Sequence, residues 1–93
     1  MVPVVAKFKL SGISTREYGN NPDGTLKILR TLEFFPVYPK SDEPNHENRK
    51  FWEATPSGKI ELGSTNDKAT NQFEIGKEYY ITFTEKPLGV IAE

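Results

Sequence analysis

Cysteine is absent from this 93-residue chain, and histidine and tryptophan each occur only once. Without cysteine, the chain can form neither a disulfide scaffold nor a zinc ribbon, and it has no thiol nucleophile. No apolar run approaches the roughly 20 residues of a membrane-spanning helix. The N-terminal stretch M-V-P-V-V-A-K-F-K-L does not fit the pattern of a signal peptide. We therefore expect a soluble intracellular protein with no membrane partner.

An excess of charge is also missing. Twelve Lys and Arg residues stand against 13 Asp and Glu residues, which leaves a formal net charge of −1. Duplex DNA binding generally needs a net basic face, so duplex nucleic acid is not an expected partner, although a local basic patch is compatible with this balance. The length predicts a single domain over residues 1–93. Because a domain of this size buries only about 60–65% of its unfolded surface, we expect a homo-oligomer.

Alternation of apolar and polar residues predicts three strands, at residues 4–13, 58–65 and 78–84. The turn cluster Y-G-N-N-P-D-G at residues 18–24 predicts a hairpin. Residues 25–37 are apolar in both parities, which fits a bulge, a strand buried on both sides, or a subunit interface. We favour a bulged strand with some burial at an interface.

Two short helical segments are predicted between these strands. In the first, Pro44 is suited to the first helical position, with Asp42 or Glu43 as the cap. In the second, Asn66 or Asp67 can cap a segment. The fold class is therefore mainly β: a small antiparallel barrel or curled sheet of four to five strands, with one or two short helical segments.

The sequence supplies no recognisable catalytic set. The single histidine, His46, lies in the polar loop P-N-H-E-N, where we expect it to be solvated. The acidic residues around it have no established metal-ligand spacing, and a hydrophilic loop is the ordinary interpretation of that segment. There is no phosphate-binding P-loop and no G-x-G-x-x-G motif. We predict neither an enzyme nor a cofactor nor a metal site.

Residues 49–58 combine aromatic, cationic and hydroxyl side chains that suit nucleotide binding. Phe51 and Trp52 are adjacent, so they face different directions. We interpret Phe51 as the anchor, and Trp52 with Arg49 and Lys50 as the ligand-facing side, since an exposed ring beside a cation suits a stacked base and its phosphate. The alternative for Trp52 is a core residue that closes the loop. The segment Thr55-Pro56-Ser57-Gly58 is either an ordinary turn or a turn that also lines the site.

A family resemblance covers most of the chain. The segments E-N-R-K-F-W-E-A-T-P-S-G-K-I-E-L at residues 47–62 and F-E-I-G-K-E-Y-Y-I-T-F-T at residues 73–84 are similar to a widespread family of small bacteriophage proteins. Its members pair an E-N-x-x-F segment and a T-P-S-G turn with a closing G-K-E-Y-Y strand. A-K-F-K-L at residues 6–10 and F-P-V-Y at residues 35–38 also match in place. S-T-N-D-K-A-T at residues 64–70 departs from the more apolar helix that the family pattern leads us to expect.

The resemblance implies a group that includes phage immune-evasion sponges, which bind the cyclic nucleotide signals of bacterial defence. The implied function is to sequester a cyclic (di)nucleotide without cleaving it, in the cytoplasm of the infected bacterial host. The alternatives are a structural or single-strand nucleic-acid-associated phage protein and, third, an enzyme that acts on nucleotides. The expected partner is thus a small anionic nucleotide ligand. We predict the ligand-binding residues Arg49, Lys50, Phe51, Trp52, Thr55 and Ser57, with Lys7, Lys9 and Tyr80 as outer candidates.

Overall fold

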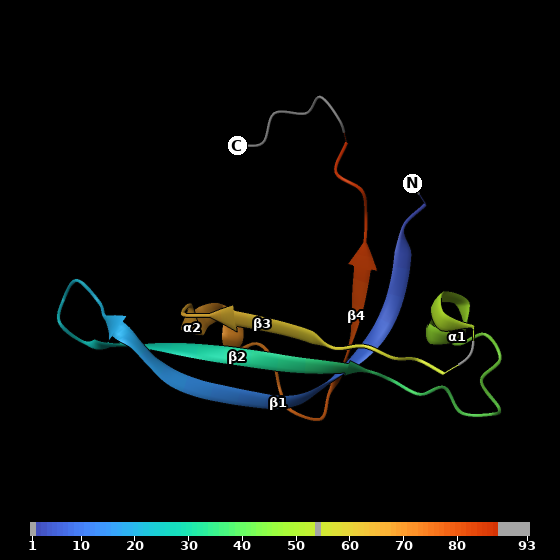
Figure 1. Cartoon of the computed structure of the whole chain (residues 1–93), viewed down its shortest axis with the longest axis horizontal. Coiled ribbons are helices and arrows are strands. Elements are labelled where there is room, and N and C mark those ends of the chain that lie inside the picture. Colours follow the sequence, from blue (N-terminus) through green and yellow to red (C-terminus); the bar gives the residue numbers. More distant parts are fainter. Residues whose placement is uncertain (1, 54, 88–93) are drawn as a thin grey trace.

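The computed structural model describes residues 2–53 and 55–87. Its elements, in chain order, are β1 (Val4–Asn20), β2 (Leu26–Pro36), α1 (Glu47–Trp52), β3 (Ile60–Ser64), α2 (Asp67–Thr70) and β4 (Glu78–Phe83). The four strands form one antiparallel sheet in the order β3-β2-β1-β4, and this sheet is not closed (Figure 1). The predicted mainly β class is confirmed as a curled open sheet with two short helices.

Strand β1 joins two parts of the sheet that run in different directions. Its first part, Val4–Lys9, pairs with β4, whereas the part from Phe8 to Asn20 pairs with β2. The strand curves between these partners, so that β4 stands across the direction of β2 and β3 (Figure 1). The sheet is therefore bent about β1.

A β-bulge in β1 keeps the apolar side chains on one face. Leu10 is opposite Phe34, but Gly12 is already opposite Glu33, so Ser11 is an extra residue in β1. This insertion moves the inward row from the even positions to Ile13, which lies opposite the buried Leu32. We expected a bulge within residues 25–37. That placement is wrong, because the extra residue lies in the partner strand.

The core is small and lies on a single face of the sheet. Its buried apolar residues in the described part of the chain are Ala6, Phe8, Leu10, Leu32 and Phe34. The ring of Phe34 meets those of Phe73 and Tyr79 edge-on, with centroids 5.9 and 6.0 Å apart. On the opposite face, Phe35 is 41% exposed. The two apolar parities of residues 25–37 thus reflect one buried face and one partly exposed face.

Local hydrogen bonds explain the turn and the second helix. In the predicted hairpin turn, the Asn21 amide donates to the Thr25 carbonyl at 2.7 Å, and the Asp23 carboxylate accepts from the Thr25 hydroxyl at 2.7 Å. Asn66 caps α2 as predicted, because its side-chain oxygen accepts from the Lys68 amide. Helix α1 begins later than expected, and its cap is His46 instead of Asp42 or Glu43.

Candidate functional site

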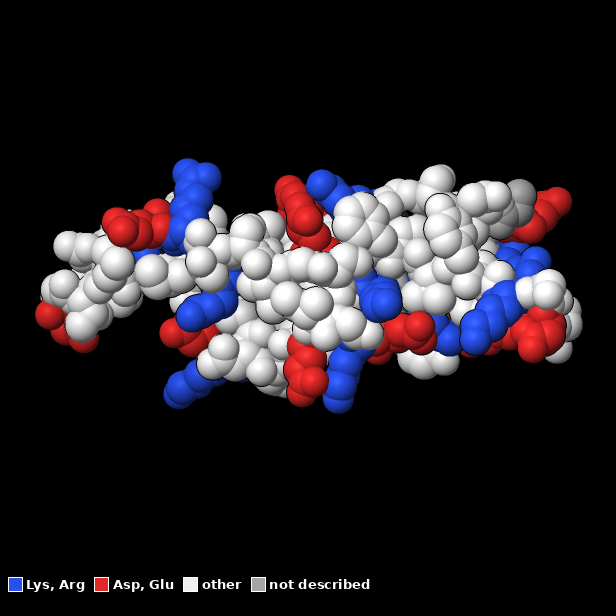
Figure 2. Space-filling view, turned by 90° about the horizontal axis from the view of Figure 1, so that it is seen from below, with Lys and Arg blue, Asp and Glu red and all other residues white. Residues whose placement is uncertain are grey.

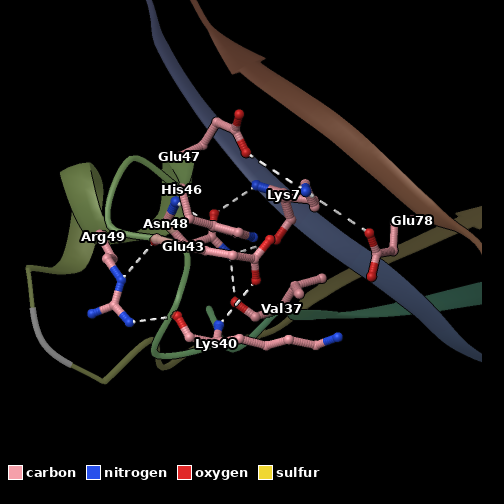
Figure 3. Close-up of polar contacts among 9 residues, drawn as sticks. All are labelled: Lys7, Val37, Lys40, Glu43, His46, Glu47, Asn48, Arg49 and Glu78. Carbon is pink, nitrogen blue, oxygen red and sulfur yellow. Dashed lines mark hydrogen bonds and ion pairs between the residues drawn. The ribbon is translucent and has the colours of Figure 1, made fainter.

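Helix α1 is attached to β1 by one buried amide. The ladder between β2 and β1 ends at Pro36. Beyond it, the Val37 amide still donates to the Lys7 carbonyl at 3.0 Å, but the Lys7 amide needs another partner. The Oδ1 atom of Asn48 accepts from the Lys7 amide at 2.7 Å, and its Nδ2 donates to the carbonyls of Lys7 at 2.8 Å and Val37 at 2.7 Å (Figure 3). Asn48 is fully buried. Its side chain thus supplies the hydrogen bonds that a neighbouring strand would make.

His46 is a helix cap and not the solvated loop residue that we expected. Its side chain is buried, and Nδ1 accepts from the Asn48 amide at 3.0 Å. This bond satisfies one of the free amides at the start of α1. Nearby, a hydrogen bond from the Lys40 amide lowers the pKa of Glu43. Within residues 2–53 and 55–87, no group of three or more metal-ligating side chains comes together.

Arg49 binds the protein's own backbone. Its Nε atom donates to the Glu43 carbonyl at 2.9 Å, and a terminal nitrogen donates to the Lys40 carbonyl at 2.8 Å (Figure 3). These bonds fasten the loop that precedes α1. Two of the donor groups that we predicted for a phosphate are therefore already used inside the chain, and the geometry gives Arg49 a structural role.

The expected roles of Phe51 and Trp52 are reversed. Trp52 packs against the buried Phe8, with ring centroids 6.0 Å apart, and its Nε1 donates to the Ser57 carbonyl at 3.0 Å. Phe51 is 51% exposed and meets the Trp52 ring edge-on. Trp52 lies one helical turn after Asn48, so it shares the side of α1 that contacts β1. The interpretation of Phe51 as the anchor and Trp52 as the ligand-facing ring is wrong.

Four of the nine predicted binding residues line two separate hollows, and the other five line neither of them. Arg49 and Thr55 line a hollow of about 240 Å³ together with Tyr38, Pro39 and Pro56. The turn that contains Thr55 and Ser57 is held by the Trp52 indole through the Ser57 carbonyl. Phe51, Ser57 and Lys9 line neither this hollow nor the larger one described next. Lys9 lies opposite Glu78 in the sheet.

The larger hollow lies between α1 and β4 and has a volume of about 620 Å³. Its lining consists of Pro3, Val4, Val5, Glu47, Lys50, Tyr80 and Thr82. We call it the α1–β4 hollow. Lys50 and Tyr80 were both predicted as binding residues, and Tyr80 is 63% exposed. The structure thus brings together a cation from α1 and an aromatic ring from β4 that are far apart in the sequence.

Lys7 and Glu47 set the charge beside this hollow. The Lys7 ammonium lies 5.6 Å from the centre of the Tyr80 ring, 3.8 Å from the Glu47 carboxylate and 3.9 Å from the Glu78 carboxylate. The buried Oε1 atom of Glu47 accepts no hydrogen bond from the described residues. The Lys7 ammonium, 3.8 Å from this same atom, offsets its charge.

The face of the molecule seen in Figure 2 shows no concentration of one charge. In Figure 2, Lys and Arg side chains alternate with Asp and Glu side chains along the face that is seen. This distribution agrees with the formal net charge of −1. None of the helices in the described ranges has the length and apolar character to cross a membrane.

Comparisons with known proteins return no matching family model, curated protein or solved structure.

Proposed function

We propose that this protein binds a small anionic nucleotide in the α1–β4 hollow and sequesters it without cleaving it. The observation that carries the proposal is that Lys50 and Tyr80, from different elements, line one hollow of about 620 Å³. This volume lies in the range of roughly 300–1,000 Å³ that is usual for small-molecule sites.

Each group of the hollow suits one part of a nucleotide. The exposed ring of Tyr80 offers a face on which a base can stack. The Lys50 ammonium can hold a phosphate. Binding without cleavage agrees with the position of His46, whose Nδ1 is used as a helix cap.

The biological role that we propose is that of a phage immune-evasion sponge. The resemblance of residues 47–62 and 73–84 to small bacteriophage proteins supports this role. Such a protein would lower the free concentration of a cyclic (di)nucleotide signal in the cytoplasm of an infected bacterium. We further propose that it acts as a homo-oligomer.

The ligand assay incubates the purified chain with cyclic dinucleotides, cyclic mononucleotides and linear oligonucleotides, releases what is retained by heat, and measures its mass. We expect an intact cyclic nucleotide. Tyr80→Ala should weaken its binding about tenfold or more, because one stacked base contributes roughly 1–3 kcal/mol. Tyr18→Ala is the matched control, since Tyr18 is 59% exposed and Tyr80 is 63% exposed. Lys50→Ala should also weaken binding, whereas Lys68→Ala, on α2, should not.

The assay separates this proposal from its competitors. A cleaved product would identify an enzyme. If no cyclic nucleotide is retained, or if Tyr80→Ala binds as tightly as Tyr18→Ala, the proposed site is wrong. The second candidate is a structural or single-strand nucleic-acid-associated phage protein, which is favoured by the exposed apolar side chains of the sheet, such as Leu62 and Phe83. Retention of linear oligonucleotides alone would support that candidate.

A further inference from the structure

A third hollow, which is apolar, lies on the face of the sheet that carries the core. It has a volume of about 530 Å³ and is lined by side chains of β2, β3 and β4 and by Phe73. Phe34, which is buried in the core, forms part of its lining, and Leu62 and Phe83 stand beside it 53% and 46% exposed. The core therefore continues into a surface that the described residues leave open. We call this surface the apolar hollow.

The edge of β4 adjoins this hollow and carries only one charged residue, Glu78 at its first position. Strand β4 pairs with β1 on one side, and the described part of the chain provides no strand on its other side. Its sequence, E-Y-Y-I-T-F, contains no proline and no lysine. The opposite edge strand, β3, carries Glu61, whose carboxylate lies 3.3 Å from the Lys59 ammonium. Charges and prolines discourage pairing between sheet edges. The charge of β3 lies within the strand, whereas that of β4 lies at its first position and Tyr79–Phe83 are uncharged, so β4 is the edge that is better suited to accept another strand.

The chain exposes more surface than a compact monomer of its mass. Its accessible area is 7184 Å², whereas a folded monomer of 10.5 kDa exposes roughly 5,400 Å². Residues 88–93 lie outside the described part, but an entire hexapeptide has at most about 900 Å² of surface, so they do not account for this excess. The radius of gyration is 16.9 Å, against about 12 Å for a compact domain of this length.

We infer that a second copy of this chain docks on the β4 edge and covers the apolar hollow. Two identical strands that pair antiparallel across a two-fold axis present the same edge to each other, so β4 is complementary to itself. The excess area exceeds the roughly 800 Å² that each partner buries in a standard interface. The net charge of −1 opposes such a pairing only weakly.

The test measures the mass of the full chain in solution over a range of concentrations, by light scattering or sedimentation equilibrium. We expect a dimer that dissociates on dilution. The double variant Leu62→Lys, Phe83→Lys should raise the dimer dissociation constant at least tenfold, because it places two cations in the apolar hollow. Tyr18→Lys adds a cation to an exposed aromatic position at the hairpin and should leave the dimer unchanged.

Folding of each variant is verified by circular dichroism, since the substituted side chains are about half exposed. Hydrogen exchange gives a second measurement: the amides of β4 should exchange more slowly as the wild-type concentration rises. A chain that stays monomeric throughout, or a dimer that the double variant does not weaken, would overturn the inference. So would a monomeric full chain that dimerises only after residues 88–93 are removed, because that segment would then be the occupant. No nucleotide enters this test, so its result is independent of the ligand assay.

Discussion

Two strand edges in this protein differ in what covers their backbone groups. At Lys7, where β2 no longer pairs with β1, the backbone is covered by the buried side chain of Asn48. Along β4, the outer edge receives no strand from the described residues. The first edge lies against α1 and away from water, so its polar groups need partners within the chain. Water can hydrogen-bond to the backbone of the second edge, but apolar side chains such as Phe83 stay exposed there.

The difference shows where this fold depends on a single side chain. A buried backbone group without a partner costs roughly 1–3 kcal/mol, so the Lys7 edge requires Asn48. Water can satisfy the β4 edge, so nothing there depends on one residue in the monomer. The following three predictions alter the covered edge, its support, and the distant hairpin turn between β1 and β2, in order of decreasing effect.

Replacing Asn48 should have the largest effect. Asn48→Ala removes three hydrogen bonds. The Lys7 carbonyl keeps its bond from the Val37 amide, but the partly buried Lys7 amide and Val37 carbonyl lose their partner. We expect the free energy of unfolding to fall by about 3 kcal/mol, measured by urea denaturation. Asn45→Ala, at an exposed position shortly before α1, is the control and should change it by less than about 0.5 kcal/mol. A loss below about 1 kcal/mol for Asn48→Ala would mean that the edge is hydrated after all.

The second-largest effect concerns the adjacent rings Phe51 and Trp52 of α1, whose removal should destabilise the fold by different amounts. Trp52→Ala removes the contact with Phe8 and the hydrogen bond to Ser57. Because Trp52 is only partly buried, we expect a loss of about 2 kcal/mol, below the usual range for fully buried aromatics. Phe51→Ala removes an exposed ring whose edge-on contact with Trp52 contributes about 1 kcal/mol or less. The same denaturation experiment compares the two, and equal losses would contradict the assignment of Trp52 as the anchor.

The smallest effect concerns pH at the hairpin turn. Hydrogen bonds from the Thr25 hydroxyl and then from the Thr25 amide lower the pKa of Asp23. A carboxyl whose pKa is lower in the folded chain stabilises the fold above its unfolded pKa, about 3.9, and this contribution is lost as the pH falls through the folded pKa. Titration of the Asp23 carboxyl by NMR should show the lowered value. Thr25→Ala should raise it towards the ordinary value, whereas the distant Thr15→Ala should not.

Patterns that act over short distances along the chain were readable from the sequence. Alternation predicted the strands that begin at Val4 and Glu78, the turn residues predicted the hairpin, and Asn66 was one of the two residues predicted as the cap of α2. The bulge at Ser11 was missed because the two apolar faces of residues 25–37 indicated a bulge in that strand instead. Closure into a barrel depends on whether the end strands β3 and β4 pair, which alternation within each strand does not specify.

Long-range contacts account for the errors at the candidate site. Asn48 was not singled out, because its partners at Lys7 are 41 residues away and nothing local marks the amide as buried. Its position decides which side of α1 faces β1, and therefore which of Phe51 and Trp52 is the anchor. The only indication was its place in the E-N-x-x-F segment. Of the predicted binding residues, Lys50 and Tyr80 meet in the α1–β4 hollow, while Arg49 and Thr55 belong to a different hollow.

The pairing of β1 with β4 has a consequence for synthesis on the ribosome. Val4 lies opposite Phe83, so β1 acquires β4 as a neighbour only after all the residues between them have been made. Helix α1 and Asn48 emerge earlier and can cover the other edge of β1 before β4 has been made. Contacts between such distant residues slow folding, and an unpaired edge promotes aggregation in the interval. The pairing of β1 with β4 should therefore be a late step in folding.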